Sequence, residues 1–342
     1  METRKIQSVG GGTYTVSIPK EWADAQGITA GDTVELHRHL DGIFAIQAPE
    51  SEQTAPTHIT VHLTREETAA IERTIRAAYA TGTKTVRLEN AQRFTSEQKT
   101  VLDRVARNLT GVSIVEDSET TITVKTLLAT SEISVTQSVR QLRFVVLSMH
   151  RDATAALAQG DAPPRAGDRD DQADRLSAMI TRSFSRAIRR LDEADALGVT
   201  RAELFELWEA TRELERIGDH AEAIATTGAV AGDGLDRETV TEIQGVAETT
   251  REIVSDAVST LIDDGGVETA QQALDTRERV REEISAAEKR LGTDAGDRSG
   301  IQPVLDRLRR TAEHGGNIAE IGLKQAVRTG ELTSVSGASD TL

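Results

Sequence analysis

Two pairs of carboxylates spaced four residues apart are the clearest chemical signal in this sequence. Glu215 and Asp219 form one pair within Leu214–Ala225, and Asp170 and Asp174 form the other. Residues four apart share one face of a helix, and two like charges there repel each other by a few tenths of a kcal/mol unless a cation lies between them. Both pairs flank the apolar stripe of their own segment. Four such carboxylates on adjacent helices would suit a divalent or iron cation (Mg, Mn, Fe or Zn).

The composition leaves a simpler interpretation of these pairs open and excludes several chemistries. Asp and Glu total 56 against 40 Lys and Arg, a formal charge of -16, so acid pairs at this spacing also arise by chance on solvated faces. There is no cysteine, which excludes disulfides, thiolate nucleophiles, Fe–S clusters and Cys-ligated zinc. Seven of the 40 basic residues are lysine. This balance is typical of salt-adapted proteins, and an ordinary acidic protein from a high-GC genome is the alternative.

The sequence gives little support to an enzyme. Gly10-Gly11-Gly12 lacks the Lys-Ser/Thr of a P-loop and precedes a predicted strand, so it is interpreted as a turn. There is no Gly-x-Ser-x-Gly nucleophile elbow. The start of the chain has no apolar signal-peptide core, and no run approaches the ~20 apolar residues that span a bilayer. We therefore predict a cytoplasmic protein without membrane insertion.

Three regions of different pattern must position these residues. In residues 1–50, alternating apolar side chains and the turn signal Asp41-Gly42 predict short strands and hairpins around a short helix at 20–26. Residues 58–128 predict a small α/β domain in the order β-α-β-α-β-β, to which we assign no chemistry. Residues 131–330 are helical throughout.

The helical region predicts a bundle of six antiparallel helices. Apolar residues recur every three or four positions from Val135 to Ala156, and glycines lie at the breaks between later segments. The further helices are expected at about 169–196, 200–228, 236–263, 267–291 and 299–328. They fall into two repeats, about 131–228 and 236–328, followed by a tail at 331–342. The predicted fold class is therefore multidomain, with an all-β head, a small α/β middle segment and an all-α body of two three-helix-bundle repeats.

The first region resembles a known DNA-binding family. The segments Gly12–Trp22 and Gly27–Val34 carry a strand, Ile-Pro, a short helix and Gly-Ile-x-x-Gly-Asp-x-Val. This pattern is similar to the AbrB/SpoVT swapped-hairpin domain. The resemblance implies an interlocked β homodimer that binds DNA through basic residues near the chain start and in hairpin loops.

Four basic residues are the candidates for that DNA contact: Arg4, Lys5, Lys20 and Arg38. Seven acids oppose them in the first 50 residues, so contact with DNA would require a local basic patch on an acidic domain. A solvated face without DNA is the alternative.

The helical region resembles the PhoU family of two-repeat bundles implicated in control of phosphate uptake. Leu214–Ala225 is close to the hallmark of that family, whose carboxylates bind metal clusters on the bundle surface. The resemblance implies metal binding at Glu215 and Asp219, with Asp170 and Asp174 at the companion position. In the second repeat Arg309 replaces the first acid and Glu313 the second. There we expect an Arg309–Glu313 ion pair in place of a second metal site.

Together these observations predict a non-enzymatic regulator of phosphate uptake and phosphate homeostasis. The head would form a homodimer and bind DNA, and the body would contact a phosphate transporter component or signalling protein. One alternative is a dimeric adaptor that acts only through protein contacts. A carboxylate-bridged metalloenzyme is the other, but the inward-facing Glu-x-x-His pairs that it requires are missing.

Overall fold

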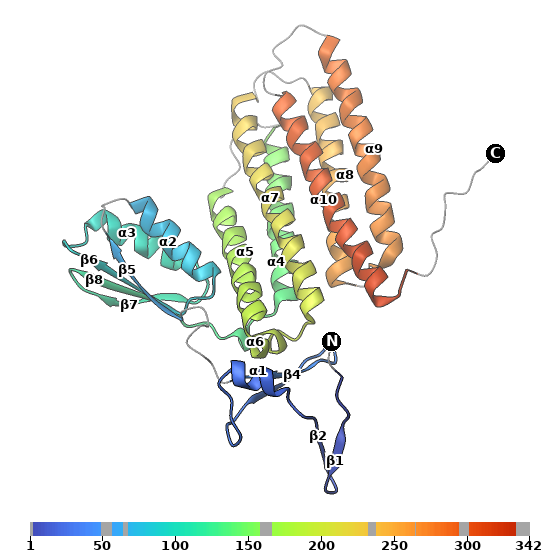
Figure 1. Ribbon diagram of the computed structural model, residues 1–342. Helices are drawn as coiled ribbons and strands as arrows, with labels where there is room; N and C mark the ends of the chain where they lie inside the picture. Colours follow the sequence, from blue (N-terminus) through green and yellow to red (C-terminus); the bar gives the residue numbers. More distant parts are fainter. Residues whose placement is uncertain are drawn as a thin grey trace. The chain divides into compact units, whose positions relative to one another are not determined.

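The computed structural model describes residues 3–48, 57–63, 68–157, 166–231, 237–263, 265–293 and 301–332. The chain divides into two compact units, Met1–Ala55 and Pro56–Leu342. The first unit is built of short strands, and the second contains an α/β segment followed by long helices (Figure 1).

The first unit, called the head below, consists of two antiparallel hairpins and one short helix. Strand β1 (Gln7–Val9) pairs with β2 (Thr13–Thr15), and β3 (Glu35–Arg38) pairs with β4 (Phe44–Gln47); α1 (Lys20–Ala25) lies between the hairpins in the chain. The predicted turn at Asp41-Gly42 is confirmed, and Gly42 has a φ of 80°, which glycine adopts without strain.

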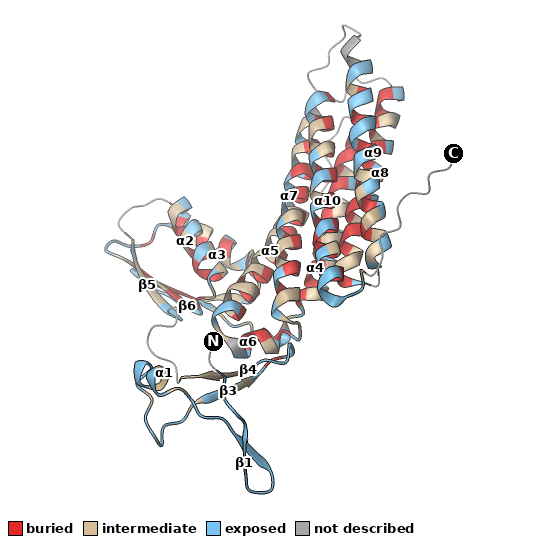
Figure 2. Ribbon diagram, turned by 45° about the vertical axis from the view of Figure 1, so that its right-hand side comes forward, coloured by how far each residue is buried: buried red, intermediate tan, exposed pale blue. Residues whose placement is uncertain are grey.

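Large apolar side chains of the head face solvent. Tyr14, Ile6 and Leu40 are 77%, 70% and 62% exposed. Among the described residues of this unit, His39 is the one in the buried class, and Figure 2 shows the head almost entirely as exposed or intermediate. A unit of this size buries too little apolar surface for a stable core of its own. The exposed apolar residues therefore indicate an additional contact surface.

The α/β segment has the predicted order of elements. It contains β5 (His58–Leu63), α2 (Thr68–Ala80), β6 (Thr85–Asn90), α3 (Ser96–Arg107), β7 (Val112–Asp117) and β8 (Thr121–Thr126). The sheet order is β5-β6-β8-β7, with β5 parallel to β6 and the other pairs antiparallel. Both helices pack on one face of the sheet (Figure 1), and their contact forms a separate core that includes Ile71, Leu88, Leu102 and Ile122.

The helical body contains the predicted long helices with one difference. The helices are α4 (Val135–Ala156), α5 (Ala166–Arg189), α6 (Leu191–Ala196), α7 (Arg201–Ala231), α8 (Arg237–Ile262), α9 (Gly266–Thr293) and α10 (Ile301–Thr329). The single helix predicted at 169–196 is wrong, because Arg190 has an extended backbone (φ -128°, ψ 115°) that separates α5 from α6. Asp192 and Glu193 lie in the first turn of α6, where the helix dipole favours acids.

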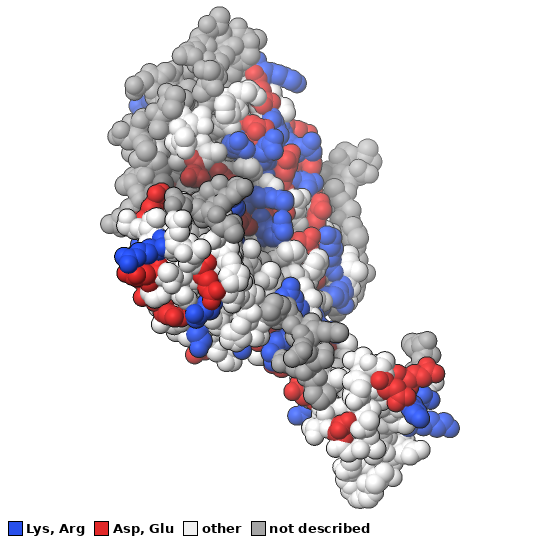
Figure 3. All heavy atoms as spheres, turned by 60° about the vertical axis from the view of Figure 1, so that its left-hand side comes forward, with Lys and Arg blue, Asp and Glu red and all other residues white. Residues whose placement is uncertain are grey.

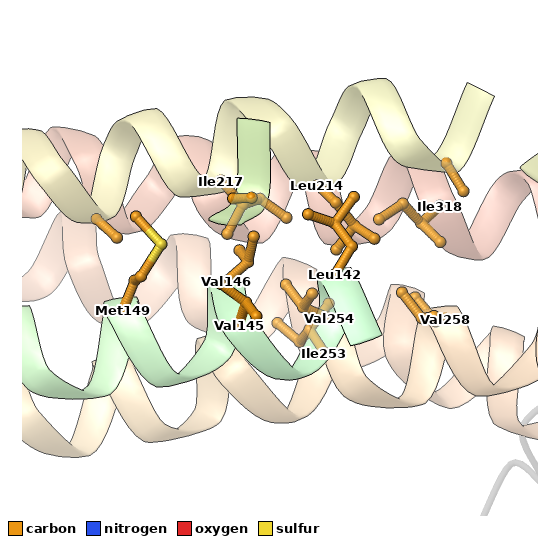
Figure 4. Packing of buried hydrophobic residues seen from close by; sticks show 14 of the residues in the cluster. Leu142, Val145, Val146, Met149, Leu214, Ile217, Ile253, Val254, Val258 and Ile318 are labelled. Atoms are coloured by element: carbon orange, nitrogen blue, oxygen red, sulfur yellow. The ribbon is translucent and has the colours of Figure 1, made fainter. Parts of the chain in front are cut away.

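One apolar core joins the two predicted repeats. Leu142 on α4, Leu214 on α7, Ile253 on α8 and Ile318 on α10 are each at most 1% exposed and belong to one cluster (Figure 4). Exposed residues cover the outer surface of these helices (Figure 2). Within the described residues, every helix is too short or too polar to cross a membrane.

A buried arginine attaches the α/β segment to the helical body. Arg182 on α5 is 3% exposed and donates hydrogen bonds to the backbone oxygens of Tyr79 (2.7 Å) and Thr83 (2.9 Å). Its guanidinium also lies 4.9 Å from the centre of the Tyr79 ring, within cation–π distance. The charge is therefore held by two carbonyl dipoles and an aromatic face.

Two further arginines of α5 contact the same turn between α2 and β6. Arg186 donates to the backbone oxygen of Gly82 (3.3 Å), and Arg189 donates to that of Thr81 (2.9 Å). Gly82 has a φ of 90°, and a Cβ built there would lie 2.6 Å from Cγ of Arg186. Any larger residue at Gly82 would therefore push the turn away from α5.

Candidate functional site

Four predicted site residues lie on two neighbouring helices of the first repeat. Asp170 and Asp174 are on α5, Glu215 and Asp219 are on α7, and we call these four side chains the carboxylate face. Glu215 and Asp219 are exposed, whereas Asp170 and Asp174 are half-buried. The prediction that these acids flank the apolar stripe is confirmed.

The four carboxylates influence one another electrostatically. Desolvation raises the pKa of Asp170 to about 6, and the charges of Asp174, Glu222 and Asp219 add to this effect. The pKa of Glu215 is also raised, first by desolvation and then by Asp174 and Asp219. The structure thus brings together the two pairs that the sequence had placed on separate helices. It adds Glu222, which the spacing analysis missed although it lies one turn beyond Asp219.

The α/β segment borders this face. Arg76 of α2 lies 4.0 Å from the carboxylate of Asp174, and Asn108 donates a 2.8 Å hydrogen bond to Asp171. Desolvation nevertheless raises the pKa of Asp174 against the opposing effect of Arg76. One edge of the carboxylate face is therefore partly neutralised from outside the bundle.

Carboxylate oxygens are the donors that a hard cation prefers. Desolvated carboxylates that raise one another's pKa are stabilised by a bound positive charge. Over the described ranges, however, no three His, Asp or Glu side chains lie close enough to form a ready-made metal cluster. Metal binding at this face remains a prediction.

The second repeat differs at the matching position. Arg309 on α10 pairs with Glu288 of α9 at 2.7 Å, so the predicted Arg309–Glu313 ion pair is wrong. The spacing of four residues permits a pair on one helix, but the half-buried Arg309 side chain reaches across to α9 instead. A cation thus occupies the place of the first acid and is neutralised by the neighbouring helix.

A histidine pair that the sequence analysis missed joins the two repeats. The rings of His220 on α7 and His314 on α10 stack 5.2 Å apart, and Nδ1 of His314 lies 2.6 Å from Oε2 of Glu213. Asn317 donates to the same oxygen at 2.9 Å. Burial alone would raise the pKa of Glu213, but these hydrogen bonds outweigh it and lower the pKa. His220 and His314 each follow the second acid position of their repeat, a signal that comparison of the repeats could have revealed.

Two histidines in this region remain neutral near pH 7. Burial lowers the pKa of His150 on α4 to about 3, helped by the charge of Arg251 on α8, and lowers that of His220 to about 4, helped by His314. His150 is fully buried and Arg251 lies 3.4 Å from its Nδ1. The contact between the repeats therefore contains neutral imidazoles that resist protonation.

The predicted DNA-binding residues are exposed and lie at separate places in the head. Arg4 and Lys5 precede β1, Lys20 is the first residue of α1, and Arg38 ends β3. On the helical body, acidic and basic side chains alternate over the face seen in Figure 3. The exposure of the four residues permits contact with a ligand and does not identify it.

Fold and carboxylate face together define a multidomain protein with a two-repeat helical body. Residues 139–227 match the family model of the PhoU domain, and this match contains the carboxylate face. Residues 7–46 match the family model described as antidote-toxin recognition MazE, bacterial antitoxin. Residues 139–227 are thus similar to PhoU domains and residues 7–46 to MazE/AbrB-like domains, which agrees with the two resemblances given by the sequence.

Two solved structures are similar to this chain. PhoU from Pseudomonas aeruginosa has 22% sequence identity and a TM-score of 0.48, covering 57% of this chain and 96% of its own. The phosphate transport system regulatory protein PhoU from Streptococcus pneumoniae has 19% identity and a TM-score of 0.43, covering 59% of this chain and 96% of its own. No curated protein matches the sequence significantly.

Proposed function

We propose that this chain is a non-enzymatic regulator of phosphate uptake. The observation that carries the proposal is the PhoU-domain match over residues 139–227, which contains Glu215 and Asp219 on an exposed helix face. The PhoU-like body contacts a phosphate transporter component or signalling protein, and the head forms a homodimer that binds DNA.

The exposed apolar side chains of the head support dimer formation. Tyr14 and Leu36 are 77% and 58% exposed in the single chain, and burial of such residues stabilises an interface by ~1.5–3 kcal/mol each. Tyr14→Ser combined with Leu36→Ser should lower the mass of the protein in solution, measured by light scattering. The control is Val115→Ser in the α/β segment, which removes another exposed apolar side chain (53% exposed). An unchanged mass for the double variant would contradict a dimer through the head.

DNA binding by the head is tested with promoter fragments of phosphate-uptake genes over a range of salt. Affinity should fall with salt at a slope near -0.9 per phosphate neutralised, and Arg4→Ala with Lys5→Ala should reduce that slope for all sequences alike. Lys289→Ala, at an exposed position on α9, is the control. If the wild type shows no sequence preference at any salt, the head acts as a dimer contact and the adaptor alternative replaces DNA binding.

Cation binding by the carboxylate face is a further part of the proposal. Glu215→Gln with Asp219→Asn should lower the content of Mg, Mn or Fe, measured by elemental analysis, whereas Glu313→Gln in the second repeat should not. Because Glu215 and Asp219 are exposed, the double variant should remain folded. Equal metal content in wild type and double variant would identify a solvated acidic face.

The role in uptake is tested in cells. Deletion of the gene should prevent the fall in uptake of labelled phosphate that follows a shift to phosphate-rich medium, and the intact gene should restore it. Uptake that responds normally in the deletion strain would refute the proposed function.

A further inference from the structure

A cavity of about 460 Å³ lies between one end of the α/β sheet and the α5–α6 junction. Lys84 and Lys125 line it from the sheet, and Arg186, Asp192 and Glu193 line it from the helices. Its volume is within the range of roughly 300–1,000 Å³ that is typical of small-molecule sites. Nothing in the proposed function uses this cavity.

The two acids of the cavity are already neutralised by neighbouring arginines. Glu193 is 7% exposed and accepts hydrogen bonds from Arg186, at 3.1 Å from Nε and through a second close contact, as well as from Thr130. Burial raises the pKa of Glu193, but the hydrogen bonds from Arg186 and Thr130 outweigh it and lower the pKa. Asp192 accepts from Nε and a terminal nitrogen of Arg190 at 3.2 and 3.0 Å. The negative charges at the cavity wall are thus compensated.

The two lysines, in contrast, have no carboxylate partner among the described residues. Lys99 elsewhere in the same segment does have one, at 2.5 Å from Asp117. Because Thr85 pairs directly with Lys125, Lys84 and Lys125 leave the sheet on opposite faces at the same end of strands β6 and β8, and both residues line the cavity. Lysine is also scarce, at seven of 40 basic residues, and two of the seven line this cavity.

We propose that this cavity binds a small organic phosphate that carries two or more negative charges, of about nucleotide size. Lysine ammonium groups bind phosphate oxygens as point charges, and Thr126 also lines the cavity. Leu127, Leu128 and Ala196 provide apolar surface for the organic part. Inorganic phosphate alone would occupy a small part of the volume.

Such a ligand would contact both parts of the second unit. Lys84 and Lys125 belong to the α/β segment, whereas Arg186 belongs to α5, which also carries Asp170 and Asp174. The ligand would therefore stabilise the attachment of the α/β segment to the helix that contributes half of the carboxylate face. This inference is independent of the proposed role in phosphate uptake.

The test is calorimetric titration of the full-length protein with AMP, ADP, ATP, pyrophosphate and inorganic phosphate, in EDTA and at low salt. At least one nucleotide should bind, and more tightly than inorganic phosphate. Lys84→Gln combined with Lys125→Gln should weaken binding by roughly tenfold or more, which corresponds to about 1.4 kcal/mol, because the variant removes both charged donors of the cavity that lack a carboxylate partner. Lys324→Gln, at an exposed position on α10, should leave binding unchanged.

Three results would overturn the proposal. The first is that none of the nucleotides gives a measurable heat of binding at millimolar concentration. The second is equal affinity in the wild type and the Lys84/Lys125 double variant when circular dichroism shows both to be folded. The third is binding of inorganic phosphate as tight as that of every nucleotide, which would overturn the organic part of the assignment. None of these measurements depends on DNA binding or uptake.

Discussion

Replacing Asp170 by asparagine should stabilise the metal-free protein at pH 7. In the folded chain desolvation and the neighbouring carboxylates raise the pKa of Asp170 to about 6, from a usual value of 3.8. The charged form is therefore disfavoured by folding. Each unit of pKa difference corresponds to about 1.4 kcal/mol, which sets an upper limit near 3 kcal/mol. Because Asp170 is half-buried and partly screened by solvent, we expect a gain of about 1–2 kcal/mol.

The direction of the pH dependence is fixed by the raised pKa. Above about pH 6 the wild type holds an ionised Asp170 that folding disfavours, and the variant avoids that cost. As pH falls from about 6 towards 3.8 the folded wild type takes up the proton, so the advantage of the variant should disappear. Added Mn²⁺ or Mg²⁺ at pH 7 should also remove it, because a bound cation favours the carboxylate.

Urea unfolding followed by far-UV circular dichroism, in EDTA, measures this effect. Asp168→Asn is the matched control, since Asp168 is exposed in the first turn of the same helix. There the loss of a negative charge near the helix N-terminus should cost about 0.3–1 kcal/mol. Destabilisation by Asp170→Asn at pH 7, or an equal gain at pH 7 and pH 4, would refute the electrostatic description of the carboxylate face.

Three further predictions concern contacts that the helices of the body make with one another and with the α/β segment. Arg182→Met should lower the free energy of unfolding by about 2–4 kcal/mol, because it removes two hydrogen bonds from a charged group and leaves the backbone oxygen of Thr83 without its arginine donor. Limited proteolysis should then cut the α/β segment first, and wild-type resistance in the variant would contradict this. Gly322→Ala should lower the melting temperature, since its Cβ would collide with Thr260 of α8. Gly245→Ala, in open space on α8, should instead raise the free energy of unfolding by about 0.5–1 kcal/mol. A loss of stability at both positions would point to general helix disruption. The free energy of unfolding should fall as the pH is lowered from about 6.5 to 4, because unfolding lets His150 and His220 take up protons. His150→Leu should flatten this pH dependence in urea titrations. An unchanged slope would show that other groups control it.

Features set by neighbouring residues in the chain were predictable from the sequence. The period of three and four from Val135 onwards gave α4, and the Asp41-Gly42 turn gave the second hairpin. The position of Glu215 and Asp219 outside the apolar stripe followed from helix geometry alone. Each of these features depends on residues within a few turns of one another.

Features set by contacts between distant segments were not predictable. The partner of Arg309 is Glu288 on another helix, although Glu313 has the spacing for an ion pair on the same helix. The break between α5 and α6 at Arg190 was not predicted, because the apolar spacing continues across it. In the folded chain Glu193 accepts a hydrogen bond from Arg186 across this break. In both cases the side chain pairs with a residue that comes close only once the chain is folded.

The attachment of the α/β segment to α5 constrains the sequence of α5 more than that of the turn that α5 contacts. Arg182, Arg186 and Arg189 all donate hydrogen bonds to backbone oxygens of the α2–β6 turn, and backbone oxygens are common to every amino acid. The turn is therefore free to vary in side chains, except where Gly82 must stay small, while the arginine spacing on α5 must persist. Among relatives, those that have lost the α/β segment should be recognisable by the loss of these arginines, and a search for the three-arginine pattern should find the chains that kept it.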